Sequence, residues 1–283
     1  MIRFPLLNIK IHPVFWLVIA AGAVTGHLWE TGIAFFLVLI HEYGHAIAAY
    51  RFGWTVREIE LLPFGGVAQL DGEEGAAFSQ ECAVLLAGPL QHVWLPFFSL
   101  AMTLTPFWNH AQHQIFLEQN LALLLFNLLP IWPLDGGRLL HLYFQKRYPY
   151  KAAYKKMLLF SMIAITFFIV LLFFIFPFSI NLWLVFSFIV ISLYKERQVL
   201  SYRFIRFLMA LSRRRTPELT VRKLVVPPEM PVSSVLALFY KYSDHRIIIE
   251  GRCGPAIEDK RLIRQFFSGR FEGKTVEESL LSE

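Results

Sequence analysis

The sequence predicts a mainly α-helical polytopic membrane protein: six transmembrane helices with a re-entrant β-hairpin, followed by a small α/β domain. Two observations predict this class. Hydrophobic residues make up 56% of the 283 residues and the mean hydropathy is +0.50, which is more apolar than typical soluble domains. No Lys or Arg occurs in three long stretches, residues 11–50, 58–137 and 157–194. Such gaps are typical of alternating membrane crossings.

The six predicted spans follow from apolar segments of about 20 residues, the length that crosses a bilayer core. The loops after the second and fourth spans are basic, whereas the loops after the first, third and fifth hold no Lys or Arg. The positive-inside rule therefore predicts that both termini face the cytoplasm. The predicted spans are 13–28, 31–50, 79–104, 114–129, 157–176 and 178–194.

The segment between the second and third spans does not look helical. Partial alternation on both sides of Pro63-Phe64-Gly65-Gly66 predicts two short strands with a tight connection. Non-helical backbone is tolerated at membrane depth only where protein or a water-filled cavity shelters it. We therefore expect a re-entrant hairpin here.

The composition changes after Tyr194. Residues 195–216 are basic and amphipathic, which predicts a linker helix on the membrane surface; a plain solvated helix is the alternative. Residues 217–283 then predict a small soluble domain of β-α-β-α order. Its expected strands are 224–226 and 247–249, and its expected helices are 232–242 and 260–267.

The sequence His41-Glu42-Tyr43-Gly44-His45 ends the apolar run of the second span. On a helix, residues four apart lie on one face, so both imidazoles can bind one zinc ion. Glu42 is rotated from that pair yet stays close enough to act as general base. A chance match is the alternative, but ionisable groups inside a membrane are costly unless they function. Gly44 leaves room for another helix.

A catalytic zinc ion needs a third protein ligand, for which the sequence favours Asp135. This carboxylate follows Pro130 and Pro133, which break the fourth helix, and precedes Gly136-Gly137. Asp135 could also cap a helix at 137–144, and the two roles are compatible. The competing third ligands are His92, Glu118 and His141. His92 could instead pack beside the ligands.

Two asparagines lie within the fourth predicted span. Asn127, near Asp135, is a candidate to donate a hydrogen bond to the oxyanion of a tetrahedral intermediate. The alternative for Asn127, and the favoured interpretation for Asn120, is hydrogen bonding between helices.

These motifs together resemble the site-2 protease family of intramembrane zinc proteases, peptidase family M50, over roughly residues 1–195. The shared features are the HExxH helix, the Pro-Phe-Gly-Gly hairpin, Ala87-Gly88-Pro89 and the segment 127–137. The resemblance implies one zinc ion held by His41, His45 and Asp135, with Glu42 as the base. Tyr43 and Leu134 depart from the usual family pattern, but neither change removes a ligand.

The amino-acid sequences of segments 62–66, 87–92 and 127–137 resemble the branch of this family that acts in endospore formation. That resemblance implies removal of the pro-sequence from a membrane-associated sporulation sigma factor, pro-sigma-K, in the mother-cell membrane around the forespore. It also implies inhibitory membrane proteins as partners. We expect Pro63, Phe64, Gly65 and Gly66 to hold an extended substrate by strand pairing near the cytoplasmic face.

The tail resembles a single cystathionine-β-synthase (CBS) motif, on residues 219–226 and 245–249. Such motifs usually pair and bind adenosine nucleotides, so the resemblance implies ATP as a ligand and a homo-oligomer formed through a second chain. The gapped distribution of basic residues indicates a lipid bilayer and no nucleic acid as partner.

Two other functions stay open from the sequence. One is a prenyl-protein-type membrane zinc protease, whose third ligand is a downstream Glu. The other is a non-catalytic metal-binding scaffold, which the intact Glu42 disfavours. Cys82 and Cys253 are far apart and indicate neither a disulfide framework nor a CxxC metal site.

Overall fold

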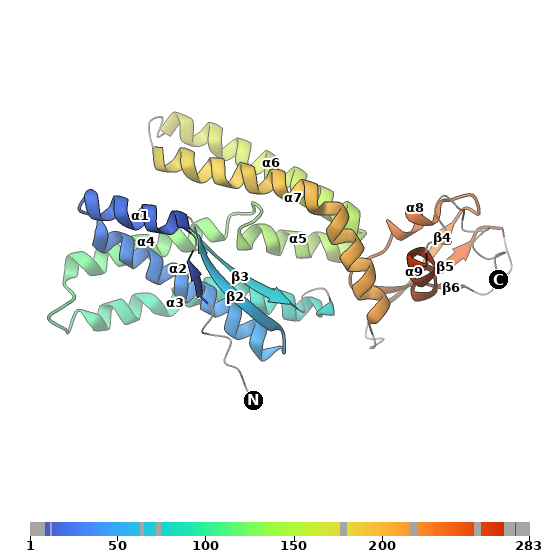
Figure 1. The fold of residues 1–283 in the computed structure, drawn as a ribbon, viewed down its shortest axis with the longest axis horizontal. Helices are drawn as coiled ribbons and strands as arrows, with labels where there is room; N and C mark the ends of the chain where they lie inside the picture. The colour runs from blue at the N-terminus through green and yellow to red at the C-terminus, as the bar shows by residue number, and fades with distance from the viewer. Residues whose placement is uncertain are drawn as a thin grey trace. The chain divides into compact units, whose positions relative to one another are not determined.

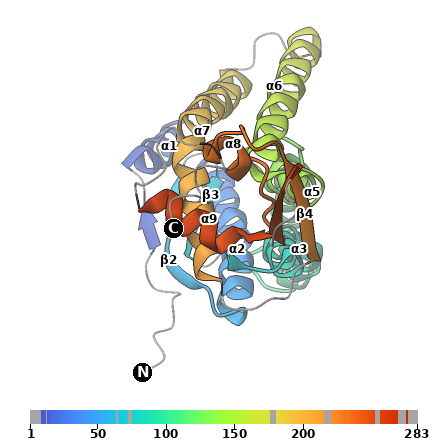
Figure 2. The ribbon, with the colours of Figure 1, turned by 90° about the vertical axis from the view of Figure 1, so that its right-hand side faces the viewer.

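The computed structural model describes residues 9–11, 13–62, 65–71, 75–175, 180–214, 220–251, 256–268 and 275. The chain forms two compact units. The first comprises residues 1–139 and 168–189, and the second comprises 140–167 and 190–283. Figures 1 and 2 show their elements from two directions.

Helices dominate the first unit. Its complete helices are α1 (Pro13–Val24), α2 (Leu28–Arg51), α3 (Phe78–Met102) and α4 (His110–Asn127). Helix α2 packs against α3 and α4 through a buried cluster of Ile33, Leu37, Leu95 and Phe116. Helices α2 and α3 approach each other closely at Gly44, where a Cβ atom would lie only 2.8 Å from Cγ of Gln91. This is the close approach that the sequence predicts for Gly44.

A small sheet joins these helices. Strands β2 (Thr55–Leu62) and β3 (Gly65–Asp71) pair antiparallel, with Leu62 opposite Gly65, so the predicted strand pair is confirmed. Pro63 and Phe64, which connect them, lie outside the described residues. Strand β1 (Ile9–Ile11), which the sequence did not predict, pairs parallel to β2. The order β1-β2-β3 makes β3 an edge strand in the described part of the chain.

Within the described residues, three helices are long and apolar enough to cross a membrane: α2, α3 and α6 (Tyr150–Ile175). Helix α1 has only 12 residues. Helix α4 begins with the mostly polar sequence His-Ala-Gln-His-Gln, which lowers the hydropathy of the helix. Six spans therefore stay a prediction, as does the depth of the hairpin in the bilayer.

The predicted linker at 195–216 is not a separate helix. Helix α7 (Ile180–Arg213) runs without interruption from the predicted sixth span through most of the linker. The reason is that no Gly or Pro occurs between Ile180 and Arg214, so nothing in the sequence ends the helix.

The second unit contains the C-terminal domain. Most of α5 (Asp135–Arg147) and of α6 lies in this unit, although α5 begins in the first unit. The elements β4, α8, β5, β6 and α9 follow later in the chain. Strand β5 pairs parallel with β4 and antiparallel with β6. The bounds are β4 Thr220–Val226, α8 Val232–Leu236, β5 Ser243–Ile249, β6 Ile257–Glu258 and α9 Asp259–Phe267.

Two details of this domain differ from the predicted β-α-β-α order: β6 is an extra strand, and α8 ends well before Tyr242. The helix ends early because tertiary hydrogen bonds engage the next backbone groups. Phe239 accepts a bond from the Tyr150 amide at 2.8 Å, and the Tyr240 amide donates to Nε2 of His245 at 2.9 Å. The domain core is also continuous with Phe207, Leu208 and Leu211 of α7.

Candidate metal centre

Three buried donor groups converge in the first unit. His41 and His45 lie one turn apart on α2, and Asp135 is the first residue of α5. Oδ2 of Asp135 lies 2.9 Å from Nε2 of His41 and 3.2 Å from Nε2 of His45. The two Nε2 atoms are 3.1 Å apart, and all three donors lie within 4.8 Å of one another. This is the ligand set that the sequence predicts.

The surroundings of His45 fix which of its nitrogens is available. Nδ1 of His45 lies 2.8 Å from the carbonyl oxygen of Val84 on α3. A carbonyl only accepts hydrogen bonds, so Nδ1 must carry the proton. In the neutral ring, Nε2 then presents a lone pair to the site, as a metal ligand requires.

The same argument holds for His41 through two more residues. Nδ2 of Asn120 donates to the His92 carbonyl at 3.0 Å, which leaves Oδ1 of Asn120 to accept from Nδ1 of His92 at 2.8 Å. Neutral His92 therefore accepts at Nε2, and His41 donates to it from Nδ1 over 3.1 Å. The Nε2 lone pair of His41 thus also faces the site. Both His92 and Asn120 are buried.

Two glycines bring backbone next to these side chains. A Cβ atom at Gly88 of α3 would lie 2.8 Å from Nε2 of His41 and closer still to the ring of His45. A Cβ atom at Gly66 of β3 would lie 2.8 Å from Cδ of Glu42. Edge strand β3 therefore passes directly beside the Glu42 carboxylate, which is buried.

Asp135 is positioned by the glycines that follow it. A Cβ at Gly136 would come within 2.6 Å of the Leu129 carbonyl oxygen, and one at Gly137 within 2.5 Å of the Trp132 nitrogen. Any side chain there would push the start of α5 away from the preceding loop. The glycine pair therefore sets the position from which Asp135 reaches the histidines.

The donor set suits zinc. Two imidazoles and one carboxylate are a common three-ligand combination for catalytic zinc, which keeps a fourth position open. Both imidazole lone pairs and the carboxylate point to one place, and each imidazole is held through its other nitrogen. Such outer hydrogen bonds are typical of metal-binding histidines.

The other predicted candidates lie elsewhere. Glu118 is exposed and accepts from Gln114 at 3.1 Å. His141 lies in the second unit, against the ring of Tyr154. His92 supports His41 and is not in the three-donor group. Asn127 is half-buried at the end of α4, and Gly65 lies at the start of β3.

Val84 and the role of Gly88 were not predicted from the sequence. Val84, Gly88 and His92 recur every four residues, so they share one face of α3, the face that meets the histidines of α2. This spacing is the signal that could have found them.

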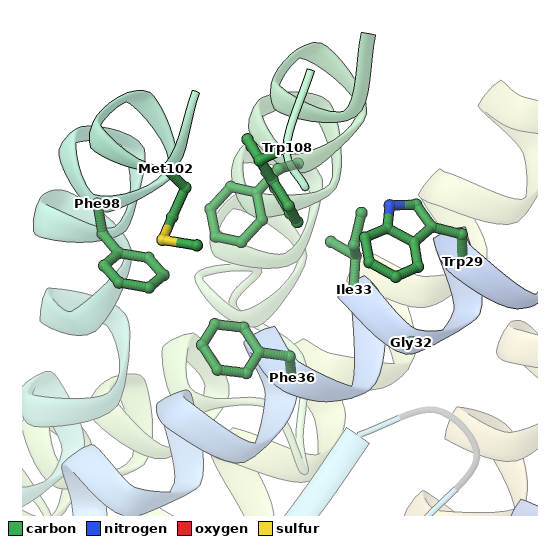
Figure 3. Close-up of a pocket in the computed structure, with 8 residues that line it drawn as sticks. Trp29, Gly32, Ile33, Phe36, Phe98, Met102 and Trp108 are labelled. Atoms are coloured by element: carbon green, nitrogen blue, oxygen red, sulfur yellow. The ribbon is translucent and has the colours of Figure 1, made fainter. Parts of the chain in front are cut away.

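A separate apolar pocket of about 310 Å³ lies near the start of α2. Figure 3 shows Trp29 of α2, Phe98 of α3 and Trp108 of the loop between α3 and α4 around it. Its lining contains no His, Cys, Asp or Glu side chain. The polar site and this apolar pocket thus use different stretches of α2.

Comparisons with known proteins agree with the geometry. The sequence model of peptidase family M50 matches residues 32–117 and 107–171. Stage IV sporulation protein FB of Bacillus subtilis (strain 168) is 34% identical over 279 residues, which are 98% of this chain and 97% of that protein. A zinc metalloprotease of Methanocaldococcus jannaschii is 31% identical over 149 residues, covering 51% of this chain and 39% of that protein.

A solved structure is similar as well. The site-2 protease from Methanocaldococcus jannaschii superimposes with a TM-score of 0.54 at 26% sequence identity. The match covers 69% of this chain and 93% of that one.

Proposed function

Because this chain belongs to peptidase family M50, the site-2 protease family, we propose that it cleaves a membrane-associated protein precursor at the centre formed by His41, His45 and Asp135. The convergence of the three buried donors supports this most directly. The precursor is a sporulation sigma factor such as pro-sigma-K, and cleavage occurs near the cytoplasmic face. The similarity to stage IV sporulation protein FB over nearly the whole chain supports this choice of substrate.

The chain's own groups divide the work of peptide hydrolysis. His41, His45 and Asp135 hold zinc, which when bound polarises the attacking water and the scissile carbonyl. Glu42, one residue after His41 and buried beside Gly66, takes the proton from the water and delivers it to the leaving amine. Asn127 is our candidate donor to the oxyanion.

The decisive experiment is Glu42→Gln in the full-length protein, reconstituted with a pro-sigma-K substrate. We expect cleavage to fall roughly 10²–10⁴-fold, the usual contribution of a general acid–base group. Bound zinc should stay at one ion per chain, because Glu42 is outside the donor group. Proteolysis near the wild-type rate would remove Glu42 from this role.

Edge strand β3 supports a mode of substrate binding. Within the described residues nothing pairs with its outer edge, and its backbone at Gly66 lies against Glu42. An extended substrate segment that adds to this edge would pass the proposed base. Phe64→Ala should weaken both cleavage and substrate crosslinking; unchanged values for both would contradict a role of the hairpin turn.

The C-terminal domain is proposed as a CBS-like regulatory domain that binds ATP and pairs with a second chain. The parallel strands β4 and β5 around α8 support this. Titration of the protein with ATP, followed by thermal unfolding, tests it. An unfolding temperature that does not respond to ATP would contradict nucleotide binding.

The exposed position of Glu118 disfavours the prenyl-protease alternative. Metal content separates the two: Asp135→Asn should lose zinc, whereas Glu118→Gln should keep it.

A further inference from the structure

Basic residues are concentrated where α5 ends and α6 begins. The stretch from residue 146 to 156 contains five of them, and no Asp or Glu occurs anywhere between Asp135 and Glu196. The charge of this segment is therefore not balanced along the chain. Four of the five are exposed and Lys151 is half-buried; the exposed ones are Lys146, Arg147, Lys155 and Lys156.

The face of α6 that carries Lys155 and Lys156 continues as an exposed apolar stripe. Leu159 is 61% exposed, Phe160 40% and Ile163 62%. The spacing of three and four residues places these side chains beyond the two lysines on one side of the helix. The opposite side is buried in the second unit through Ala153, Tyr154, Met157 and Leu158.

This stripe belongs to a helix that is long and apolar enough to span a membrane. Large apolar side chains that stay exposed on such a helix face lipid chains. The two lysines lie at the end of the stripe, where the hydrocarbon gives way to headgroups.

Tyrosines accompany the cations at the same level. The ammonium group of Lys156 lies 4.5 Å from the ring centroid of Tyr148, and the guanidinium of Arg147 lies 5.5 Å from that of Tyr143. Both tyrosines are exposed. Tyr together with Lys and Arg is the usual composition of the membrane interface.

From these observations we infer that an anionic phospholipid binds on this face of α6. Its phosphate contacts Lys155 and Lys156, supported by the charge of Lys146 and Arg147, and its acyl chain lies along Leu159, Phe160 and Ile163. An acidic segment of a partner protein would neutralise the basic residues but would leave the exposed apolar stripe of Leu159, Phe160 and Ile163 unexplained. A phospholipid matches both parts. This surface does not include any residue of the metal centre.

Native mass spectrometry of the full-length protein, released from bilayers of equal phosphatidylglycerol and phosphatidylcholine, tests the inference. The variant Lys155→Gln/Lys156→Gln should retain roughly tenfold less phosphatidylglycerol, because each basic residue near the surface strengthens binding to anionic lipid. Its phosphatidylcholine should not change. The matched control is Lys223→Gln/Arg246→Gln, which also removes two exposed charges, from paired strands of the C-terminal domain, and should retain lipid like the wild type.

A second variant, Lys155→Arg/Lys156→Arg, keeps the charge and should restore binding if Gln weakens it for the proposed reason. Thermal unfolding shows whether each variant is folded. Wild-type retention of phosphatidylglycerol by the Gln variant would overturn the inference. An equal loss of phosphatidylglycerol and phosphatidylcholine in the Gln variant would also overturn it. So would a poly-glutamate peptide that displaces lipid from the wild type and does not bind the Gln variant.

Discussion

In the described part of the chain, two buried aspartates, Asp135 and Asp259, lie beside histidines with similar geometry but in different surroundings. In the first unit, His41 lies 2.9 Å from Asp135. In the C-terminal domain, His245 lies 3.2 Å from Asp259. All four residues are at most 6% exposed. Burial and proximity alone therefore do not distinguish a metal centre from a structural pair.

The difference lies in how the polar atoms are used. In the second pair, Nδ1 of His245 faces Asp259, and its Nε2 accepts from the Tyr240 amide at 2.9 Å. The oxygens of Asp259 accept from the amides of His245 and Lys260. Backbone amides thus donate hydrogen bonds to both His245 and Asp259. Around Asp135, the Nδ1 atoms of His41 and His45 bond to His92 and to the Val84 carbonyl. Their Nε2 atoms remain directed toward the same point beside the carboxylate.

The largest expected effect comes from the same substitution in both pairs. Asp135→Asn should lower zinc affinity more than 100-fold, beyond the range for loss of an outer hydrogen-bond partner, and abolish cleavage. Asp259→Asn should leave zinc content unchanged and cost roughly 1–3 kcal/mol of stability, because a buried hydrogen-bond network is disturbed. Metal analysis and thermal unfolding of both variants measure this. Zinc loss in Asp259→Asn, or its retention in Asp135→Asn, would contradict the comparison.

A second change tests whether the space around the Nε2 atoms matters. Gly88→Ala would place a methyl group against both histidine rings, so we expect zinc affinity to fall about tenfold or more, since overpacking costs about 1–3 kcal/mol. Gly32→Ala, in the same helix as the histidines, is the control, because a Cβ there meets nothing within 4 Å. Competition with a metal chelator measures both. Equal affinities would show that the site adapts to the added methyl.

These residues also show what the sequence could predict. The spacing of His41 and His45 follows from helix periodicity, and Asp135 stands out because prolines and glycines surround it. Both inferences are local. The links from Val84 to His45 and from Asn120 through His92 to His41 join different helices, so they depend on helix packing that no local pattern encodes.

The same limit explains the errors in the fold. Strand β1 was not predicted because three residues carry no useful periodicity, and it exists through pairing with β2. Helix α8 is shorter than its apolar pattern suggests because hydrogen bonds with Tyr150 and His245 engage the backbone that follows it. Helix α7 continues past the predicted boundary because composition changes at Tyr194 while helix propensity does not.

His92 offers a smaller test of the first pair. His92→Phe keeps a ring of similar size but removes the acceptor for Nδ1 of His41, and it leaves Oδ1 of Asn120 without its donor. Loss of an outer partner typically lowers metal affinity 10–100-fold. We expect weaker zinc binding, with KM for the substrate nearly unchanged and kcat restored by excess zinc. A variant that binds zinc like the wild type would show that the tautomer of His41 is set without His92.

The smallest effect concerns His141, a buried histidine that belongs to neither pair. Burial, together with the positive charges of Lys241 and Arg203, lowers the pKa of His141 to about 3. The folded protein therefore keeps this ring neutral, whereas the unfolded chain takes up a proton below its ordinary pKa of about 6.5. Stability from this residue is thus complete above pH 6.5 and is lost as the pH falls toward 3.

Substitution of His141 should remove its contribution to the loss of stability at low pH. Between pH 6.5 and 5.5, His141→Gln should lose about 1 kcal/mol less stability than the wild type. Thermal unfolding in detergent at several pH values measures the difference, with His110→Gln as control because that histidine is exposed. Parallel pH profiles for the wild type and His141→Gln would mean that the folded protein accommodates the protonated ring.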